Sequence, residues 1–245
     1  ARFTIHVYTD APEAFARLEG RVELRVVTGA ELADWTLPAG YHHRAKPAAI
    51  RDLARRYPSD RLLFADADSA FTGSAAAVFE RVGPRSAVMH EREYEVAASD
   101  LAVMHRFRRR MSKATFRGAP VELRRDMWNS GAVGLHPEQF PIVEDWLAYL
   151  DEVFPQVRRW VLEQYALASL LQERGIALRE ASDVLVHYWF DKAAYAAVIR
   201  ERLRNSAALS LDETLALIRA SPIDRERRTT SYGKRANFFQ RVFGW

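Results

Sequence analysis

Residues 61–71 have the sequence RLLFADADSAF, and this stretch decides how we interpret the fold. The short apolar run at 61–65 favours a buried strand. It is followed by Asp66 and Asp68, and if the backbone turns there, both carboxylates can converge on one hard cation such as Mg²⁺ or Mn²⁺. A chain of this composition contains about one Asp-x-Asp by chance. The motif gains weight from its place at the mouth of a buried strand, where an unpaired charge is costly.

Outward from this stretch, strand and helix patterns alternate through the first half of the chain. Strand patterns cover residues 3–8, 22–27, 61–65 and 86–90, and helical patterns cover residues 46–57 and 73–82. This alternation favours an α/β fold with a mixed, mainly parallel central sheet flanked by helices. Such sheets bind ligands beyond the carboxyl ends of their strands, where Asp66 and Asp68 fall.

The second half of the chain is less regular. Residues 90–126 are charged and rich in arginine, and an ordered acceptor loop and a solvated helix face are both open for them. Further on, the patterns predict strands at 131–136 and 184–187, and helices beginning at Pro137 and spanning 159–174, 191–204 and 212–220. We expect one main domain over residues 1–205, with a C-terminal helix and a basic-aromatic tail over residues 206–245.

Composition limits the class of protein. With 245 residues, 49% hydrophobic and 28% charged, the chain is typical of a globular protein. The absence of cysteine excludes disulfide scaffolds, cysteine-ligated zinc and thiol catalysis, and it fits a reducing compartment. We therefore expect a cytoplasmic protein without a signal peptide or a spanning helix. Only four of the 36 basic residues are lysines, and arginine is the better bidentate ligand for phosphate, although biased composition explains the excess equally well.

Several other segments carry polar residues suited to binding and catalysis. They are Thr9 and Asp10 after the first strand, Arg44 and Lys46 before the helix at 46–57, Asn129, Ser130 and Gly131 in WNSGAVG, Glu163 and Gln164 in EQYAL, and His187 in VLVHYWFDK. In this order, the segments resemble the nucleotide-sugar glycosyltransferases of the Rossmann-like GT-A fold. Family 8 of the glycosyltransferases and related retaining bacterial families are the most similar, over roughly residues 3–192.

The resemblance implies a metal site and a donor site. Asp66, Asp68 and His187 would hold Mn²⁺ or Mg²⁺ against the diphosphate of a nucleotide-sugar donor, with UDP as the expected nucleotide. The remaining donor contacts would be Thr9 and Asp10 at the base, Arg44, Lys46 and Asp66 at the phosphates or sugar, and Asn129, Ser130 and Gly131 at the sugar. The family 8 pattern H-x-x-G-x-x-K-P-W is broken here, with Phe190 in place of the glycine and Lys192 one residue early. Lys192 and Lys234 are therefore both candidates for the phosphate-binding lysine.

The same resemblance implies roles in sugar transfer. Glu163 would bind donor-sugar hydroxyls, and Gln164 would lie beside the anomeric carbon. His90 and Glu91 would face the acceptor, a hydroxyl of a glycan or glycolipid. Retention of configuration is expected from family 8, whereas an inverting enzyme would need a carboxylate base, for which Glu91 and Glu163 are the candidates.

Two other classes stay open as alternatives. Haloacid-dehalogenase-like phosphohydrolases also place Asp-x-Asp after a strand, but their motif lies near the N-terminus and ends in Thr or Val, where this chain has Ala70. A non-catalytic glycan-binding module is the other alternative. The tail at 225–245 mixes basic and aromatic residues, as would suit contact with the inner face of a membrane or packing on the domain. Nucleic-acid binding is not expected, because the net charge is only +4 and the Asp-x-Asp mouth is acidic.

Overall fold

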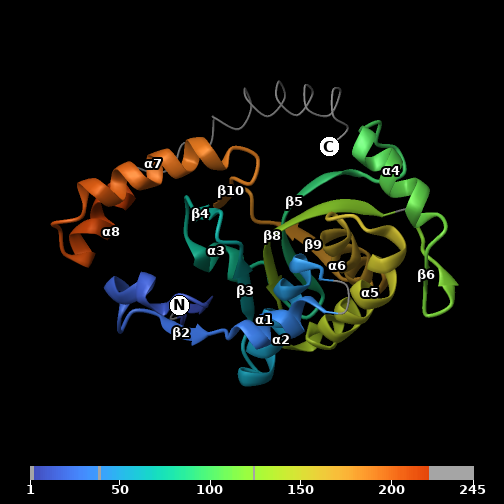
Figure 1. The fold of residues 1–245 in the computed structure, drawn as a ribbon, viewed down its shortest axis with the longest axis horizontal. Helices are drawn as coiled ribbons and strands as arrows, with labels where there is room; N and C mark the ends of the chain where they lie inside the picture. Colours follow the sequence, from blue (N-terminus) through green and yellow to red (C-terminus); the bar gives the residue numbers. More distant parts are fainter. Residues whose placement is uncertain (1–2, 38–39, 124, 221–245) are drawn as a thin grey trace.

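The computed structural model of the chain describes residues 3–37, 40–123 and 125–220, which form a mixed α/β structure (Figure 1). Its largest sheet has four strands in the order β3 (Leu62–Ala65), β8 (Asp126–Leu135), β5 (Ser86–Glu95) and β9 (Ala177–Glu180). Every residue of β8 after Asp126 is buried. This long central strand therefore places the polar residues Asn129 and Ser130 inside the core of the fold.

The expectation of a mainly parallel sheet is wrong. β8 runs antiparallel to both β3 and β5, and in this sheet only β5 and β9 are parallel neighbours. An uninterrupted apolar run indicates burial on both faces, but it does not reveal strand direction. The connection sets the direction here, because β8 begins where β5 ends, with Asp126 opposite Glu95.

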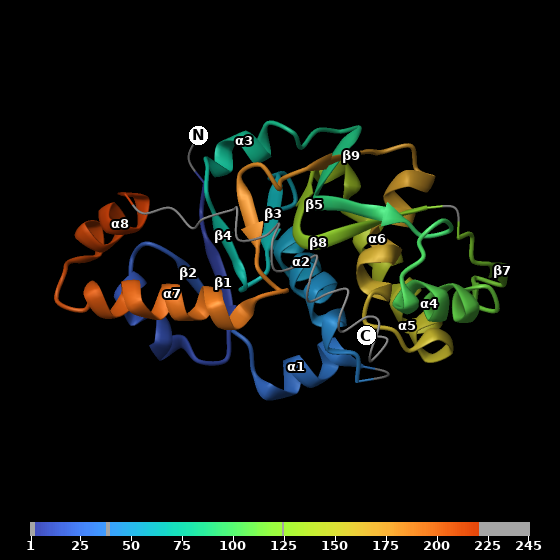
Figure 2. The same ribbon diagram turned by 90° about the horizontal axis from the view of Figure 1, so that it is seen from above.

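Two predicted strands lie outside the large sheet. β1 (His6–Thr9) and β2 (Glu23–Val26) form a parallel pair, and in the described part of the chain they pair only with each other. Figure 1 and Figure 2 show this pair near one end of the molecule, with α4 (Ala102–Met111) toward the opposite end. A further antiparallel pair, β4 (Ser69–Phe71) with β10 (Leu185–His187), lies between the β1–β2 pair and α4 (Figure 1). Asp68 directly precedes β4, and His187 is the last residue of β10.

Helices α5 (Pro141–Val157) and α6 (Leu162–Glu173) form the main hydrophobic core with the large sheet. The first ten residues of α6 are all buried, which explains why its sequence lacks a polar face. The predicted helix at 46–57 is confirmed as α2 (Ala45–Arg56), whereas the one at 73–82 is reduced to α3 (Ala75–Phe79). The remaining N-terminal elements are α1 (Gly29–Thr36) and 3-10 helices at Pro12–Leu18 and His42–Arg44; a third 3-10 helix, Pro137–Gln139, precedes α5.

The arginine-rich stretch forms the helix α4, followed by the short strands β6 (Thr115–Phe116) and β7 (Ala119–Pro120). After β10 come α7 (Lys192–Asn205) and α8 (Leu211–Ala220). The Arg17 guanidinium donates to the Leu209 carbonyl at 3.0 Å and to Thr214 Oγ1 at 3.2 Å, so α8 is attached to the N-terminal segment. Among the described residues, no helix has the length and apolar character needed to cross a membrane. The basic-aromatic tail lies outside the described residues.

Candidate metal centre

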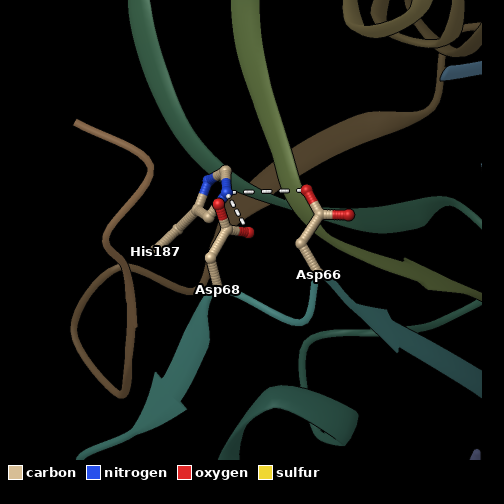
Figure 3. A group of neighbouring side chains, drawn as sticks. All are labelled: Asp66, Asp68 and His187. Atoms are coloured by element: carbon tan, nitrogen blue, oxygen red, sulfur yellow. Dashed lines mark hydrogen bonds and ion pairs between the residues drawn. The ribbon is translucent and has the colours of Figure 1, made fainter. Parts of the chain in front are cut away.

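Asp66, Asp68 and His187 come together at the point where three strands meet (Figure 3). Asp66 follows β3, and its backbone N–H donates to the Gly131 carbonyl of β8 at 2.9 Å. Asp68 precedes β4, and its carbonyl accepts from the Tyr188 N–H at 2.9 Å, just after β10. These bonds hold a turn of the chain between the two aspartates, which is the condition for their carboxylates to converge.

The potential ligand atoms of the three side chains lie within 4.8 Å of one another. His187 Nε2 is 3.2 Å from Asp68 Oδ1 and 3.5 Å from Asp66 Oδ2. The side chains are 8%, 19% and 25% exposed for His187, Asp68 and Asp66, so a cation bound here keeps an open side. Two carboxylates and an imidazole are a donor set that suits Mn²⁺. They also suit Mg²⁺, which prefers the carboxylate oxygens to the imidazole nitrogen.

Asn129 fixes the tautomer of His187. Asn129 Oδ1 accepts the Gly131 backbone N–H at 2.9 Å and lies 2.8 Å from His187 Nδ1. An acceptor oxygen at that distance holds a proton on Nδ1, so Nε2, which faces the two aspartates, is the nitrogen that would coordinate a cation. A second hydrogen bond of this kind orients the histidines of many metal sites. The residues present therefore fit a divalent cation.

Gly131 makes room for the histidine ring. A Cβ atom at this position would lie 2.1 Å from His187 Nδ1 and 2.3 Å from Cγ. The NSG segment of β8 thus contributes to the metal centre through the absence of a side chain at Gly131.

Lys46 connects Asp66 with Glu163. Lys46 Nζ lies 3.1 Å from Asp66 Oδ2 and 3.5 Å from Glu163 Oε2, and it donates to the carbonyl and Oγ atoms of Ser130, both at 2.9 Å. Burial acts to lower the pKa of Lys46, but the charges of Glu163 and Asp66 outweigh it and raise the pKa. Lys46 therefore stays a cation in a buried position beside the metal centre.

Glu163 and Lys192 complete the charge balance around the two aspartates. Burial raises the pKa of Glu163, and the Lys46 charge offsets part of that rise. The exposed Lys192 forms an ion pair with Asp68 Oδ2 at 2.7 Å. Burial alone would raise the pKa of Asp68, but hydrogen bonds from His187 and Lys192 hold it well below the usual range of a carboxyl. The cluster carries a small net negative charge, which a divalent cation would reverse.

Glu93 is a member of the site that the sequence analysis missed. Its carboxylate accepts from Asn129 Nδ2 and from Gln164 Nε2, both at 3.1 Å. Burial is the main cause that raises the pKa of Glu93. The signal in the sequence was the alternation of EREYE at 91–95, which predicts Glu91, Glu93 and Glu95 on one face of the strand.

Other predicted residues lie apart from the metal centre. The Arg44 guanidinium donates to Asp151 at 2.9 Å and to the Trp35 carbonyl at 2.9 Å, so the structure does not bring it to the two aspartates. Arg44 precedes α2 and is directed to α5, whereas Lys46, in the first turn of α2, reaches the aspartates. Thr9 Oγ1 accepts the Ala11 backbone N–H at 3.0 Å. Asp10 is exposed next to it, and Lys234 lies outside the described residues.

The two residues assigned to the acceptor, His90 and Glu91, lie next to each other on β5. His90 is 1% exposed, and its Nε2 contacts the Leu185 carbonyl at 3.1 Å. Its ring packs edge-on against His187, with centroids 5.6 Å apart, so it is a buried neighbour of the candidate metal centre. Glu91 is half-buried, with its carboxylate 3.7 Å from His90 Nδ1. The sequence pattern ended this strand at His90 and Glu91, whereas β5 continues to Glu95, so both residues lie in the middle of the strand.

No protein-family model and no curated protein matches the chain. The geometry therefore carries the functional argument. It consists of three candidate ligands with a fixed histidine tautomer, two lysines beside the aspartates, and a buried glutamate and glutamine next to them. This arrangement can hold a divalent cation together with an anionic ligand.

Proposed function

We propose that the protein is a metal-dependent glycosyltransferase of the GT-A type. It would transfer a sugar from a nucleotide diphosphate donor, with UDP as the favoured nucleotide, to a hydroxyl of a glycan or glycolipid. The observation that carries this proposal is the Asp66, Asp68 and His187 cluster, in which His187 Nε2 faces the two carboxylates. A diphosphate site uses a metal and nearby cations, and the ligand cluster with Lys46 and Lys192 supports both roles.

Lys46 and Lys192 are placed to neutralise charge on the nucleoside diphosphate, the leaving group of the proposed reaction. A bound divalent cation would act as a Lewis acid and template for the two phosphates. Lys46 is held by Asp66, Ser130 and Glu163, so its charge is fixed in place before any ligand arrives. Lys192 is 66% exposed and pairs only through the end of a flexible side chain, so it can exchange Asp68 for a donor phosphate.

Glu163 is suited to binding a sugar hydroxyl. Its Oε2 atom accepts from Ser130 Oγ at 2.8 Å, whereas Oε1 is buried and has no hydrogen-bond partner among the described residues. A buried carboxylate oxygen without a partner is costly, and a donor hydroxyl would remove that cost. Asn129, expected to bind the sugar, has its oxygen engaged by Gly131 and His187 and acts here as a positioning residue.

Retention is the stereochemical outcome we propose. Glu163 is paired with Lys46, and Glu93 accepts from two amides, so neither carboxylate is placed to take a proton from an acceptor. Gln164, held by Glu93, would lie near the anomeric carbon. Glu91 is the carboxylate to substitute if product analysis shows inversion.

A thermal-shift screen of nucleoside diphosphates and UDP-sugars, with and without Mn²⁺, tests this function. We expect a rise in melting temperature that needs both the metal and a nucleotide, and that Asp68→Asn abolishes. Asp60→Asn, an exposed aspartate in a turn, is the matched control and should respond like the wild type.

Three results would contradict the proposal. The first is a wild-type protein that shows no metal-dependent nucleotide binding and no hydrolysis of any UDP-sugar. The second is release of phosphate from an aryl phosphate, which would favour the phosphohydrolase class. The third is glycan binding in calorimetry that needs neither nucleotide nor metal, which would favour a binding module.

A further inference from the structure

Two arginine-rich segments meet at the C-terminal end of α5. On α4, Arg106, Arg109 and Arg110 follow the spacing of one helix face, while the apolar face of the same helix is buried. The second segment, Arg158 and Arg159, connects α5 to α6. Five arginines thus belong to two segments that are distant in sequence.

A hydrogen bond joins the two segments. Arg110 Nη1 donates to the Val157 carbonyl at 2.8 Å, at the end of α5. The next residue, Arg158, ends the helix in a left-handed conformation with φ of 50°. The backbone turns there, and Arg159 follows on the way to α6.

Four of these arginines have no acidic partner in the described part of the chain. Within residues 3–37, 40–123 and 125–220, no carboxylate forms an ion pair with Arg109, Arg110, Arg158 or Arg159, and the buried Nε of Arg159 has no hydrogen-bond partner. Burial lowers the pKa of Arg159, and so do the charges of Arg110, Arg106 and Arg109. Crowded like charges are unfavourable until an anion joins them.

The arginine segments are also connected to the metal centre. Trp160 follows Arg159, and its ring centroid is 6.2 Å from that of Trp189, two residues beyond His187. The Tyr41 hydroxyl donates to the Trp160 carbonyl at 2.6 Å and accepts from the Glu163 N–H at 3.2 Å. An anion bound by the arginines would therefore lie beside the two tryptophans, at the side of the site where α6 begins.

We propose that Arg109, Arg110, Arg158 and Arg159 bind a phosphate group of the acceptor, whose adjoining sugar packs against Trp160 and Trp189. The planar guanidinium fork binds phosphate oxygens in pairs, and several forks around one phosphate give both affinity and orientation. Tryptophan rings provide a broad apolar surface with a polar edge for a sugar. The acceptor role rests on the proposed glycosyltransferase function, whereas the phosphate site itself does not.

Calorimetry with inorganic pyrophosphate in the presence of EDTA tests the phosphate site. Without a metal, the acidic donor site does not attract pyrophosphate, so binding reports the arginines. We expect the double variant Arg109→Gln/Arg159→Gln to weaken binding by about tenfold or more. Arg200→Gln/Arg204→Gln removes the same charge from exposed positions on α7 and should leave the affinity within about twofold.

Further measurements distinguish a lipid-borne phosphate from a soluble one and check that each variant is folded. Co-sedimentation with phosphatidylcholine vesicles containing phosphatidylglycerol, compared with phosphatidylcholine alone, tests a lipid-borne phosphate diester. Loss of vesicle binding alone in the arginine double variant would assign the site to a lipid acceptor, and loss of pyrophosphate binding to a soluble one. Arg109→Lys/Arg159→Lys keeps the charge and should recover only part of the affinity, while melting temperatures report the fold of each variant.

The proposal fails if the arginine double variant, folded as judged by its melting temperature, binds both pyrophosphate and vesicles like the wild type. This outcome is distinguishable from failure of the glycosyltransferase function. If metal-dependent nucleotide binding is missing but the arginine variant still loses pyrophosphate in EDTA, the phosphate site stands and its role as an acceptor site falls. If nucleotide binding is present and the arginine variant is unaffected, only the phosphate site falls.

Discussion

Asn129 Oδ1 lies 2.8 Å from His187 Nδ1, and this contact links the centre of the large sheet to the candidate metal centre. Asn129 is on β8 and His187 ends β10, so the hydrogen bond joins two sheets that share no backbone ladder. On its other side, Asn129 donates to Glu93, which in turn accepts from Gln164. One buried side chain thus relates the orientation of the histidine to the position of the glutamine.

Asn129→Ala should weaken Mn²⁺ binding by about 10- to 100-fold, because the variant removes the acceptor that holds the proton on Nδ1 of His187. Asn129→Asp keeps that acceptor and should lose less affinity. Isothermal titration with Mn²⁺ at neutral pH measures both variants. Equal Mn²⁺ affinity in Asn129→Ala and the wild type would show that the hydrogen bond does not orient the ligand.

Gly131→Ala should displace the His187 ring and abolish metal binding, because the new Cβ would lie 2.1 Å from Nδ1. Gly29→Ala is the matched control, since a Cβ at that position meets nothing within 4 Å. Mn²⁺ titration and the melting temperature together separate loss of the site from loss of the fold. Wild-type Mn²⁺ affinity in Gly131→Ala would mean that the ring does not lie over β8.

Glu93→Gln should lower kcat for donor hydrolysis or transfer while leaving Mn²⁺ affinity closer to the wild type than Asn129→Ala does. The carboxylate accepts from two amides, and a glutamine at this position can accept with only one of its two terminal atoms. Gln164 would then lose its fixed position. Comparison of kcat with the donor KM and the Mn²⁺ affinity tests this role, and an unchanged kcat would contradict it.

The sequence predicted that Asp66, Asp68 and His187 form one cluster, and the structure brings them together. Asp66 and Asp68 follow an apolar strand, so both carboxylates were expected at the mouth of a buried element. His187 was assigned from the resemblance to the glycosyltransferases and its spacing from Asp68, and its Nε2 lies 3.2 Å from Asp68 Oδ1. Lys46 was predicted at the same site, but its buried contact with Glu163 depends on α2 and α6 packing together.

The direction of individual side chains was harder to predict from the sequence. Arg44 and Lys46 are two residues apart, yet one is directed to Asp151 and the other to Asp66. Residues 91–95 alternate regularly, but β5 has register shifts on both sides of Glu91 and Arg92, which change the direction of the side chains that follow. Side-chain direction near irregular backbone depends on tertiary packing, and periodicity in one sequence does not contain it.

Lys46→Met should destabilise the fold by about 3–5 kcal/mol, because it leaves the buried Glu163 carboxylate without its cation. The double variant Lys46→Met/Glu163→Gln removes both charges and should recover part of the loss. Urea unfolding at neutral pH gives the free energies of unfolding. If the single and double variants are equally stable, the two side chains do not interact as the 3.5 Å contact indicates.

His43 provides a pH-dependent contribution to stability. Burial, together with the charges of His42, Lys46 and Lys192, lowers its pKa from 6.5 to about 4. As the pH falls from 6.5 to about 4, the unfolded chain takes up this proton before the folded one does, so the free energy of unfolding decreases across that window. His43→Asn should flatten this decrease, while His136→Asn, away from the metal centre, should not. Urea unfolding at pH 7 and pH 5 measures the difference, and equal slopes for the wild type and His43→Asn would contradict the assignment.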